Sequence, residues 1–96
     1  MTRLVLSPKA VDDVDRLSDF LLDSDPSNAS KTGGILVSGL RILKDHPLIG
    51  RQVERGFQEL LASRGRTGYV ALYEFDLIKD VAIVLSIRHQ REAGYF

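Results

Sequence analysis

The spacing of hydrophobic positions changes near residue 51. Before that point, apolar residues recur every three or four positions, as they do on one face of a helix. After it they alternate with polar residues, as in strands that have one face buried. A short apolar run, Leu4–Leu6 (L-V-L), precedes the helical part and predicts a first strand. We therefore expect one strand, then helices, then a sheet.

The pair Ser7-Pro8 predicts the start of the first helix. Serine can accept a hydrogen bond from a free N–H of the first turn, and proline at the first helical position has no N–H to lose. The apolar face consists of Val11, Val14, Leu17 and Leu21. Other positions carry aspartates: Asp12, Asp13, Asp15, Asp19 and Asp23. We interpret the acidic positions as a solvated face, with docking against a basic partner as the alternative.

A second helix is predicted from about residue 27 to residue 45. Its interior contains Gly33-Gly34, although each glycine costs roughly 1 kcal/mol relative to alanine in a helix. We favour a close approach between the two helices over a kink as the explanation. The helix should end at His46-Pro47, because the residue before a proline avoids helical geometry.

Three strands are predicted after the helices, at about residues 57–62, 69–75 and 81–88. The connection over residues 76–80 is short, so the last two strands should form an antiparallel hairpin. The final strand is apolar on both faces for most of its length, which favours a place inside the sheet. The order β-α-α-β-β-β predicts a single α+β domain (residues 1–96), with a helical hairpin packed on a small antiparallel sheet.

Composition restricts the classes of function. Thirteen basic residues balance thirteen acidic ones, so nucleic-acid binding would require a local patch rather than a broad positive field. The chain has no cysteine, and its two histidines, His46 and His89, fall in separate elements. We therefore expect neither a disulfide nor a metal site. No apolar run is long enough for a signal peptide or a membrane span, so we expect a cytoplasmic protein.

Cations gather where the last predicted strand ends. Arg88, His89 and Arg91 follow the strand without an intervening glycine or proline, so a rigid sheet would hold them. Arg64 and Arg66 lie in a glycine-punctuated turn, which either lets the backbone approach an anion or is a solvated hairpin tip.

His89 has two interpretations. It is a candidate general acid or base for RNA cleavage, with Arg66 and Arg88 stabilising the phosphate. We favour the other interpretation, a structural or binding role.

Three segments stand in a distinctive order: H-P-L-I-G-R after the helices, Y-V-A-L-Y-E-F in the middle strand, and V-L-S-I-R-H-Q-R-E-A-G-Y at the end. With this order and spacing the chain resembles the RelE/ParE superfamily of bacterial toxins, above all its ParE, or plasmid-stabilisation, branch. The resemblance implies the toxin of a type II toxin–antitoxin system. Its antitoxin would carry a ribbon-helix-helix DNA-binding domain, through which alone the toxin would meet DNA.

The superfamily arrests growth in two ways: ParE-like members poison DNA gyrase, and RelE-like members cut messenger RNA on the ribosome. RelE-like members are typically rich in lysine and arginine across the sheet, whereas this chain has one lysine after residue 44 and no net charge. We therefore expect a gyrase inhibitor without cofactor or catalytic residue. The expected target-binding residues are Arg64, Arg66, Arg88, His89 and Arg91.

Two alternatives remain open. One is a ribosome-dependent endonuclease centred on His89, Arg66 and Arg88, and the other is a non-toxic partner in a repressor complex. In each case, apolar residues in excess of one small core are expected to line a groove for the antitoxin. These are Phe57, Leu60, Leu61 and Val70.

Overall fold

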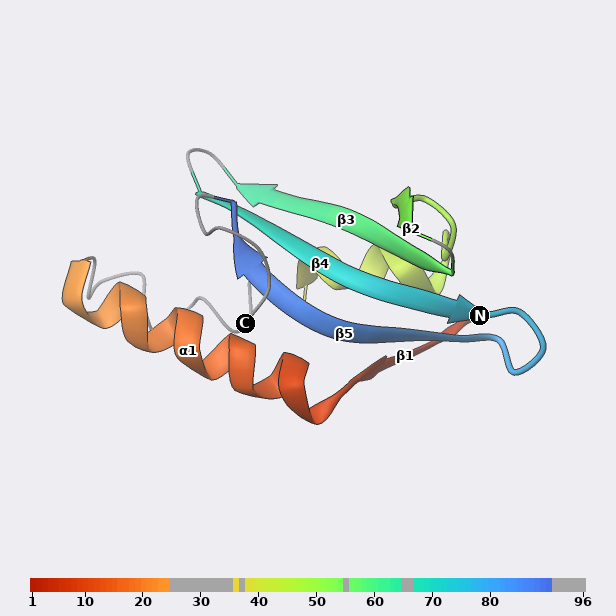
Figure 1. Cartoon of the computed structure of the whole chain (residues 1–96), viewed down its shortest axis with the longest axis horizontal. Coiled ribbons are helices and arrows are strands. Elements are labelled where there is room, and N and C mark those ends of the chain that lie inside the picture. The colour runs from red at the N-terminus through yellow and green to blue at the C-terminus, as the bar shows by residue number, and fades with distance from the viewer. Residues whose placement is uncertain (25–35, 37, 55, 65–66, 91–96) are drawn as a thin grey trace.

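A computed structural model describes most of the chain: residues 1–24, 36, 38–54, 56–64 and 67–90, with the backbone alone for 18–24, 62–64 and 67. These described residues form five strands, the long helix α1, further helical residues at 36 and 38–40, and the short 3-10 helix η1 (Figure 1). Their bounds are β1 Arg3–Leu6, α1 Pro8–Ser24, η1 Arg41–Lys44, β2 Arg51–Glu54, β3 Phe57–Arg64, β4 Thr67–Asp76 and β5 Val81–His89.

The sheet has the strand order β1-β5-β4-β3-β2. β5 lies between β1 and β4, so the predicted interior position of the last strand is confirmed. The prediction of an antiparallel sheet was wrong in one pairing, because β1 runs parallel to β5. Parallel neighbours need a long connection, and the rest of the domain provides one. β2 was not predicted at all, since its four residues are all exposed and have no buried face.

The ladder between β4 and β5 contains one irregularity. Tyr73 pairs with Val84, but its neighbour Leu72 pairs with Ser86, so Leu85 is an extra residue on β5. Such a bulge shifts the alternation of side chains by one position. As a result, Val84 faces the core before the bulge and Ile87 faces it afterwards.

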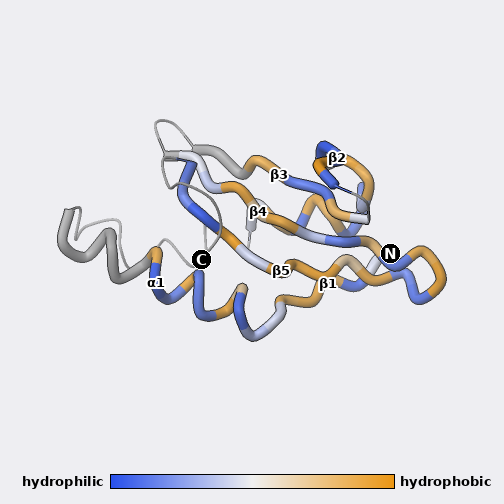
Figure 2. The backbone as a smooth tube through the Cα atoms, in the orientation of Figure 1, coloured by the Kyte–Doolittle hydropathy of each residue, from blue (hydrophilic) through white to orange (hydrophobic). Residues whose placement is uncertain are grey.

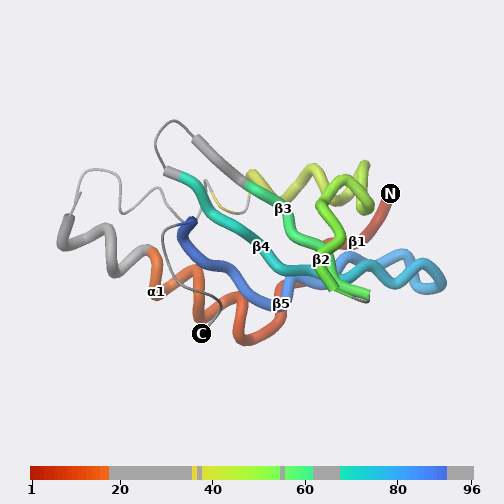
Figure 3. The backbone as a smooth tube through the Cα atoms, turned by 45° about the horizontal axis from the view of Figure 1, so that its top comes forward, coloured from red at the N-terminus to blue at the C-terminus, as the bar shows by residue number. Residues whose placement is uncertain are grey.

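The helical residues cover one face of the sheet. The first helix begins as predicted, because Ser7 Oγ accepts a hydrogen bond from the Ala10 N–H at 3.1 Å. α1 lies beside β5 in both views of the backbone (Figures 1 and 3). Of the predicted second helix, residues 36 and 38–40 are helical and η1 follows, while Gly33-Gly34 lies outside the described residues. Among the described helices, none is long and apolar enough to cross a membrane.

The core fills the space between the helical layer and the sheet. Hydrophobic residues follow β5 and β1, whereas α1 alternates between hydrophobic and hydrophilic positions (Figure 2). The buried cluster comprises Ala10, Leu17, Leu36, Leu40, Leu43, Leu60, Tyr69, Ala71, Tyr73, Ala82, Val84 and Ile87. The opposite face of the sheet is not covered by these helices, and we call it the open face.

Tyr73 connects the H-P-L-I-G-R segment to the centre of the sheet. Its buried hydroxyl donates a hydrogen bond to the Pro47 carbonyl at 2.8 Å and accepts one from the Gly50 N–H at 2.9 Å. A Cβ atom at Gly50 would lie 2.6 Å from this hydroxyl, so only glycine fits. Burial raises the pKa of Tyr73 more than the hydrogen bond from the Gly50 N–H lowers it. The hydroxyl therefore stays protonated and remains a donor at neutral pH.

The β4–β5 hairpin is confirmed. Asp76 Oδ1 accepts hydrogen bonds from the N–H groups of Ile78 and Lys79, both at 3.0 Å, which closes the turn. Asp80 adopts φ 53°, a left-handed conformation that aspartate tolerates better than most residues.

Tyr73→Phe should lower the free energy of unfolding by about 1–3 kcal/mol, because it leaves the half-buried Pro47 carbonyl and Gly50 N–H without their partner. Chemical denaturation measures the change. Tyr69→Phe is the matched control, since Tyr69 is also buried and the contact described for it is made by its ring. Equal losses in the two variants would contradict a special role for the Tyr73 hydroxyl.

Candidate target-binding site at the end of the sheet

Arg88 and His89 are the last two residues of β5, and they point to opposite faces of the sheet. The strand register pairs Arg88 with Val70 and His89 with Tyr69. Paired residues share a face, and successive residues alternate between faces. Tyr69 belongs to the core. His89 therefore lies on the helix-covered face, and Arg88 lies on the open face.

His89 packs against an aromatic ring. Its imidazole meets the Tyr69 ring edge to face, with centroids 5.6 Å apart and planes at 87°. Burial raises the pKa of the Tyr69 hydroxyl. The histidine therefore lies at the margin of the core.

The Arg88 guanidinium folds back over the end of its own strand. Nη1 donates to the carbonyl of His89 at 3.4 Å and to the carbonyl of Gln90 at 3.3 Å. The side chain is half-buried. These bonds satisfy carbonyl groups at a strand end, and they also hold the cation at a defined place on the sheet.

The topology brings the end of β3 to the same place. β3 and β5 flank the start of β4, where Ser63 pairs with Gly68 and the Gln90 N–H donates to the Gly68 carbonyl at 2.9 Å. Arg64 is the next residue of β3, and its backbone is described but its side chain is not. Arg66 and Arg91 lie outside the described residues. The predicted cluster of cations thus stays a prediction for these three arginines.

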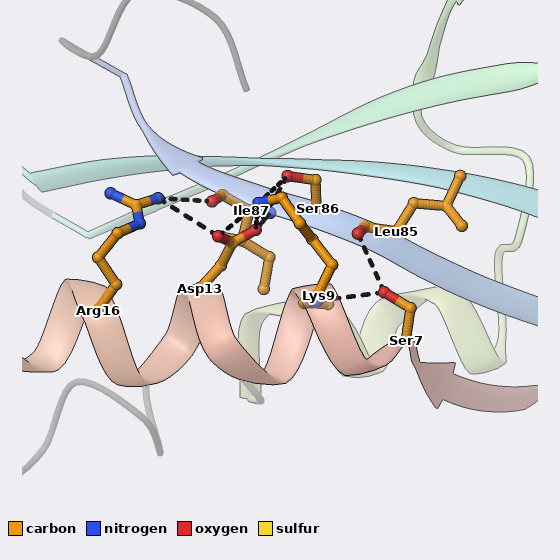
Figure 4. Close-up of polar contacts among 8 residues, drawn as sticks. Ser7, Lys9, Asp13, Arg16, Leu85, Ser86 and Ile87 are labelled. Atoms are coloured by element: carbon orange, nitrogen blue, oxygen red, sulfur yellow. Dashed lines mark hydrogen bonds and ion pairs between the residues drawn. The ribbon is translucent and has the colours of Figure 1, made fainter. Parts of the chain in front are cut away.

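A polar network fixes the strand from which Arg88 and His89 project (Figure 4). Asp13 of α1 has only 3% of its surface exposed. Its carboxylate accepts hydrogen bonds from Lys9 Nζ at 2.7 and 2.8 Å. It also accepts bonds from Ser86 Oγ and from the Ile87 N–H, each at 2.9 Å. A single carboxylate therefore ties the helix to the strand.

Beyond the end of β1, the backbone groups on the edge of β5 find their hydrogen-bond partners in Ser7 and in side chains of α1. The β1 ladder stops at Val84, whose carbonyl accepts a hydrogen bond from the Ser7 N–H at 2.9 Å. Ser7 Oγ then donates to the Leu85 carbonyl at 3.0 Å, and Arg16 Nη2 donates to the Ile87 carbonyl at 3.2 Å. Buried backbone groups need such partners, so the helix replaces a missing strand.

The residues predicted to bind the antitoxin do not all share one face. Leu61 pairs with Val70 across β3 and β4, and Phe57 lies four residues earlier on β3, so these three lie on the open face. Leu61 is 54% exposed, whereas Val70 is buried. Leu60 belongs to the core on the other face. The prediction was therefore wrong in placing Leu60 on the same surface, and the antitoxin-binding role of the other three stays a prediction.

Comparison with known proteins decides the family. The family model described as the ParE toxin of the type II toxin–antitoxin system parDE matches residues 4–94. The chain belongs to the ParE toxin family. It is a toxin of the type II toxin–antitoxin class within the RelE/ParE superfamily, and the resemblance seen in its sequence is confirmed.

Two relatives span almost the whole of this ParE-family toxin. Toxin RelE3 from Caulobacter vibrioides is 32% identical over 92 residues, which cover 96% of this chain and 98% of the relative. The crystal structure of the toxin–antitoxin complex RelBE2 from Mycobacterium tuberculosis contains a similar chain, with a TM-score of 0.59 and 22% identity over 93% of this chain and 98% of that one. The second likeness concerns the fold, and it agrees with the predicted α+β class.

Sequence reasoning missed the role of Asp13 in this ParE-family toxin, because it treated the five aspartates of the helix as one solvated face. Asp12 and Asp15 are exposed as expected. Asp13, however, lies three residues after Ala10 and four before Leu17, both of which are buried. Leu17 was already predicted on the apolar face, and Asp13 lies one helical turn before it, so the spacing from Leu17 could have identified Asp13.

The Asp13 carboxylate is also the group in the network that responds to acid. Burial raises its pKa, but hydrogen bonds from Lys9, the Ile87 N–H and Ser86, together with the charge of Lys9, lower it further than burial raises it. The pKa in the folded protein thus lies below the ordinary value of 3.8. The ionised Asp13 carboxylate therefore contributes fully to folding stability at pH values above its ordinary pKa of 3.8. This contribution is lost as the pH falls through the lower pKa of the folded protein.

Asp13→Asn should lower the free energy of unfolding at neutral pH by about 2–3 kcal/mol, since hydrogen bonds to a charged group are lost. It should also flatten the fall in stability below about pH 4. Denaturant melts from pH 7 to pH 3 measure both effects. Asp12→Asn on the exposed side of the same helix is the control. A D13N variant with the acid dependence of the wild type would refute the network.

Proposed function

We propose that this ParE-family toxin arrests growth by binding DNA gyrase and inhibiting it, without catalysing a reaction itself. We further propose that a cognate antitoxin with a ribbon-helix-helix DNA-binding domain neutralises it, so that the toxin meets DNA only through that antitoxin. Because both proposed partners are cytoplasmic, we propose the cytoplasm as the place where the toxin acts. The observation that carries the choice of target is the separation of Arg88 and His89 onto opposite faces of the sheet.

Cleavage of RNA requires a proton-transferring group and a phosphate-stabilising cation around one phosphodiester. Arg88 is directed to the open face, while His89 is packed on Tyr69 at the helix-covered face. The two side chains do not face a common substrate. This arrangement favours His89 as a packing residue and Arg88 as a contact for another macromolecule.

The charges of the open face favour a protein over a nucleic acid as the target. Glu59 lies opposite Leu72, and Glu74 lies two residues further along β4, so both carboxylates share the face with Arg88. Nucleic-acid binding draws its affinity from lysine and arginine contacts to phosphates. The open face carries both positive and negative side chains, and the whole chain has no net charge. Such a face matches the mixed charges of a protein surface better than the uniform negative charge of a nucleic acid.

The apolar residues of the open face support the proposal that the antitoxin binds over this face. An antiparallel sheet with one solvated face normally alternates apolar and polar residues. Here Phe57, Leu61, Val70 and Leu72 all lie on the face that the helices leave open. Val70 is already buried, and a segment of antitoxin laid across this face would cover the exposed Leu61 and the half-buried Phe57 and Leu72 and would occlude Arg88 at the same time. The similar chain from Mycobacterium tuberculosis was crystallised in a toxin–antitoxin complex.

A ribosome-dependent messenger RNA endonuclease is the second candidate. The relative that is 32% identical bears the name Toxin RelE3, and RelE-like members of the superfamily are expected to cut messages. In that case His89, Arg66 and Arg88 would be the catalytic residues. A third possibility is a non-toxic partner of the antitoxin in a repressor complex.

Purified toxin should inhibit supercoiling of relaxed plasmid by gyrase and leave messages intact in a translating extract. Arg88→Gln should weaken inhibition about tenfold or more, because arginines at the centre of an interface carry much of its binding energy. His89→Ala should keep its inhibitory strength. Loss of activity on gyrase in H89A, or cleavage of messages by the wild type, would contradict the proposal.

Induction of the toxin alone in cells distinguishes the three candidates. Gyrase inhibition should give filaments and a DNA-damage response while translation continues. Cleavage of messages should stop translation within the first minutes and leave cuts at the ribosomal A site. Normal growth after induction would leave only the third candidate, the non-toxic partner in a repressor complex.

A further inference from the structure

The open face contains a depression at the end of the sheet opposite Arg88. Its volume is about 270 Å³, and its lining consists of Val53, Glu54, Phe57, Glu59 and Leu72. β2 supplies one side, close to where β3 begins (Figures 1 and 3). Sites for cofactors and drug-sized ligands usually measure about 300–1,000 Å³. This smaller, open depression fits one side chain of a partner.

The lining combines apolar surface with two carboxylates. Val53, Phe57 and Leu72 provide the apolar part, and Glu54 and Glu59 provide negative charge. Glu59 is 16% exposed in its side chain, and its Oε1 accepts a hydrogen bond from Arg51 Nη2 at 3.2 Å. Arg51 itself is 78% exposed. A guanidinium therefore already binds at the margin of the depression.

We infer that this depression receives a lysine or arginine side chain from the antitoxin. Long cationic side chains bury their aliphatic stem on apolar surface and keep the charged head near polar groups. Phe57 adds an aromatic ring with which such a head interacts favourably. The two carboxylates repel a phosphate, so the occupant is a basic protein side chain rather than a nucleic acid. The inference rests on the proposed function, in which the antitoxin covers the open face.

The positions of the charges also determine the direction of the antitoxin segment. Arg88 lies beside Val70, and Leu72 in the depression lies two residues further along β4, about 7 Å away at the spacing of a strand. A complementary segment carries an acidic residue toward Arg88, an apolar residue over the exposed Leu61, and its basic residue at the depression. The reverse direction brings like charges together at both ends.

The test measures binding of the full-length antitoxin to the full-length toxin by calorimetry at low and at physiological salt. Glu54→Gln/Glu59→Gln should raise the Kd about tenfold or more and reduce its salt dependence, because an ionic contact is removed. Glu74→Gln, on the same face but outside the lining, is the matched control and should bind like the wild type. In cells, the double variant should stay toxic at antitoxin levels that silence the control.

A charge exchange identifies the occupant. Each lysine and arginine of the antitoxin's toxin-binding segment is changed to glutamate and paired with toxin carrying Glu54→Lys/Glu59→Lys. One pairing should restore the Kd that either partner alone has lost. Should the double glutamine variant fail to fold, Glu54→Gln alone serves, because Glu54 is exposed.

The possible failures are distinguishable. An unchanged Kd and salt dependence in the double glutamine variant would overturn this inference and leave the proposed function standing. A wild-type toxin that binds no antitoxin would overturn both. Normal antitoxin binding with lost gyrase inhibition would assign the depression to the target and overturn its assignment to the antitoxin.

Discussion

The arrangement of this ParE-family toxin depends on the buried carboxylate of Asp13. β5 is an inner strand along its first half, but its neighbour β1 ends at Leu6, and the remaining edge of β5 needs other partners. Asp13 supplies an acceptor to the Ile87 N–H, while Ser7 and Arg16 donate to carbonyls on either side. Removing a charge from water is costly unless hydrogen bonds and an opposite charge compensate it. Here Lys9 provides both.

This junction also determines what the end of the strand presents to a partner. Because Ile87 is held against α1 and faces the core, the next residue faces outward and the one after it faces inward. The outward residue is an arginine and the inward one is a histidine. The toxin thereby places a cation on a surface with apolar and acidic neighbours, which suits recognition of proteins better than chemistry on a phosphodiester. In the proposed complex, the same surface would offer the antitoxin apolar strands and, in the depression, a charge opposite to that of Arg88.

Local signals in the sequence were sufficient for local structure. The Ser7-Pro8 helix start, the short hairpin after Asp76 and the interior position of the last strand were all predictable, since each depends on neighbouring residues or on the hydrophobicity of one segment. The parallel pairing of β1 was not predictable from alternation, because it joins residues about 80 positions apart. β2 lacked any apolar face, and it owes its place to pairing with β3.

The candidate site was predictable in part, for a related reason. Sequence showed that cations follow the last strand, but it could not say which of two neighbouring residues faces which side. Leu60 was grouped with Leu61 on hydrophobicity, although alternation separates them. Asp13 was grouped with four other aspartates, although it shares the buried side of the helix with Ala10 and Leu17. Arg66 and Arg91, outside the described residues, remain predictions.

The bulge at Leu85 determines which side chain the end of β5 presents on the open face. Because Leu85 is an extra residue on β5, even-numbered residues face the helices before it, and odd-numbered residues face them after it. If β5 kept all its residues but paired with β4 without the bulge, Arg88 would pair with Tyr69 and face the helices, and the His89 imidazole would turn outward. The register of the strand past Leu85 therefore decides whether the guanidinium or the imidazole is presented on the open face, while the scaffold beneath stays the same.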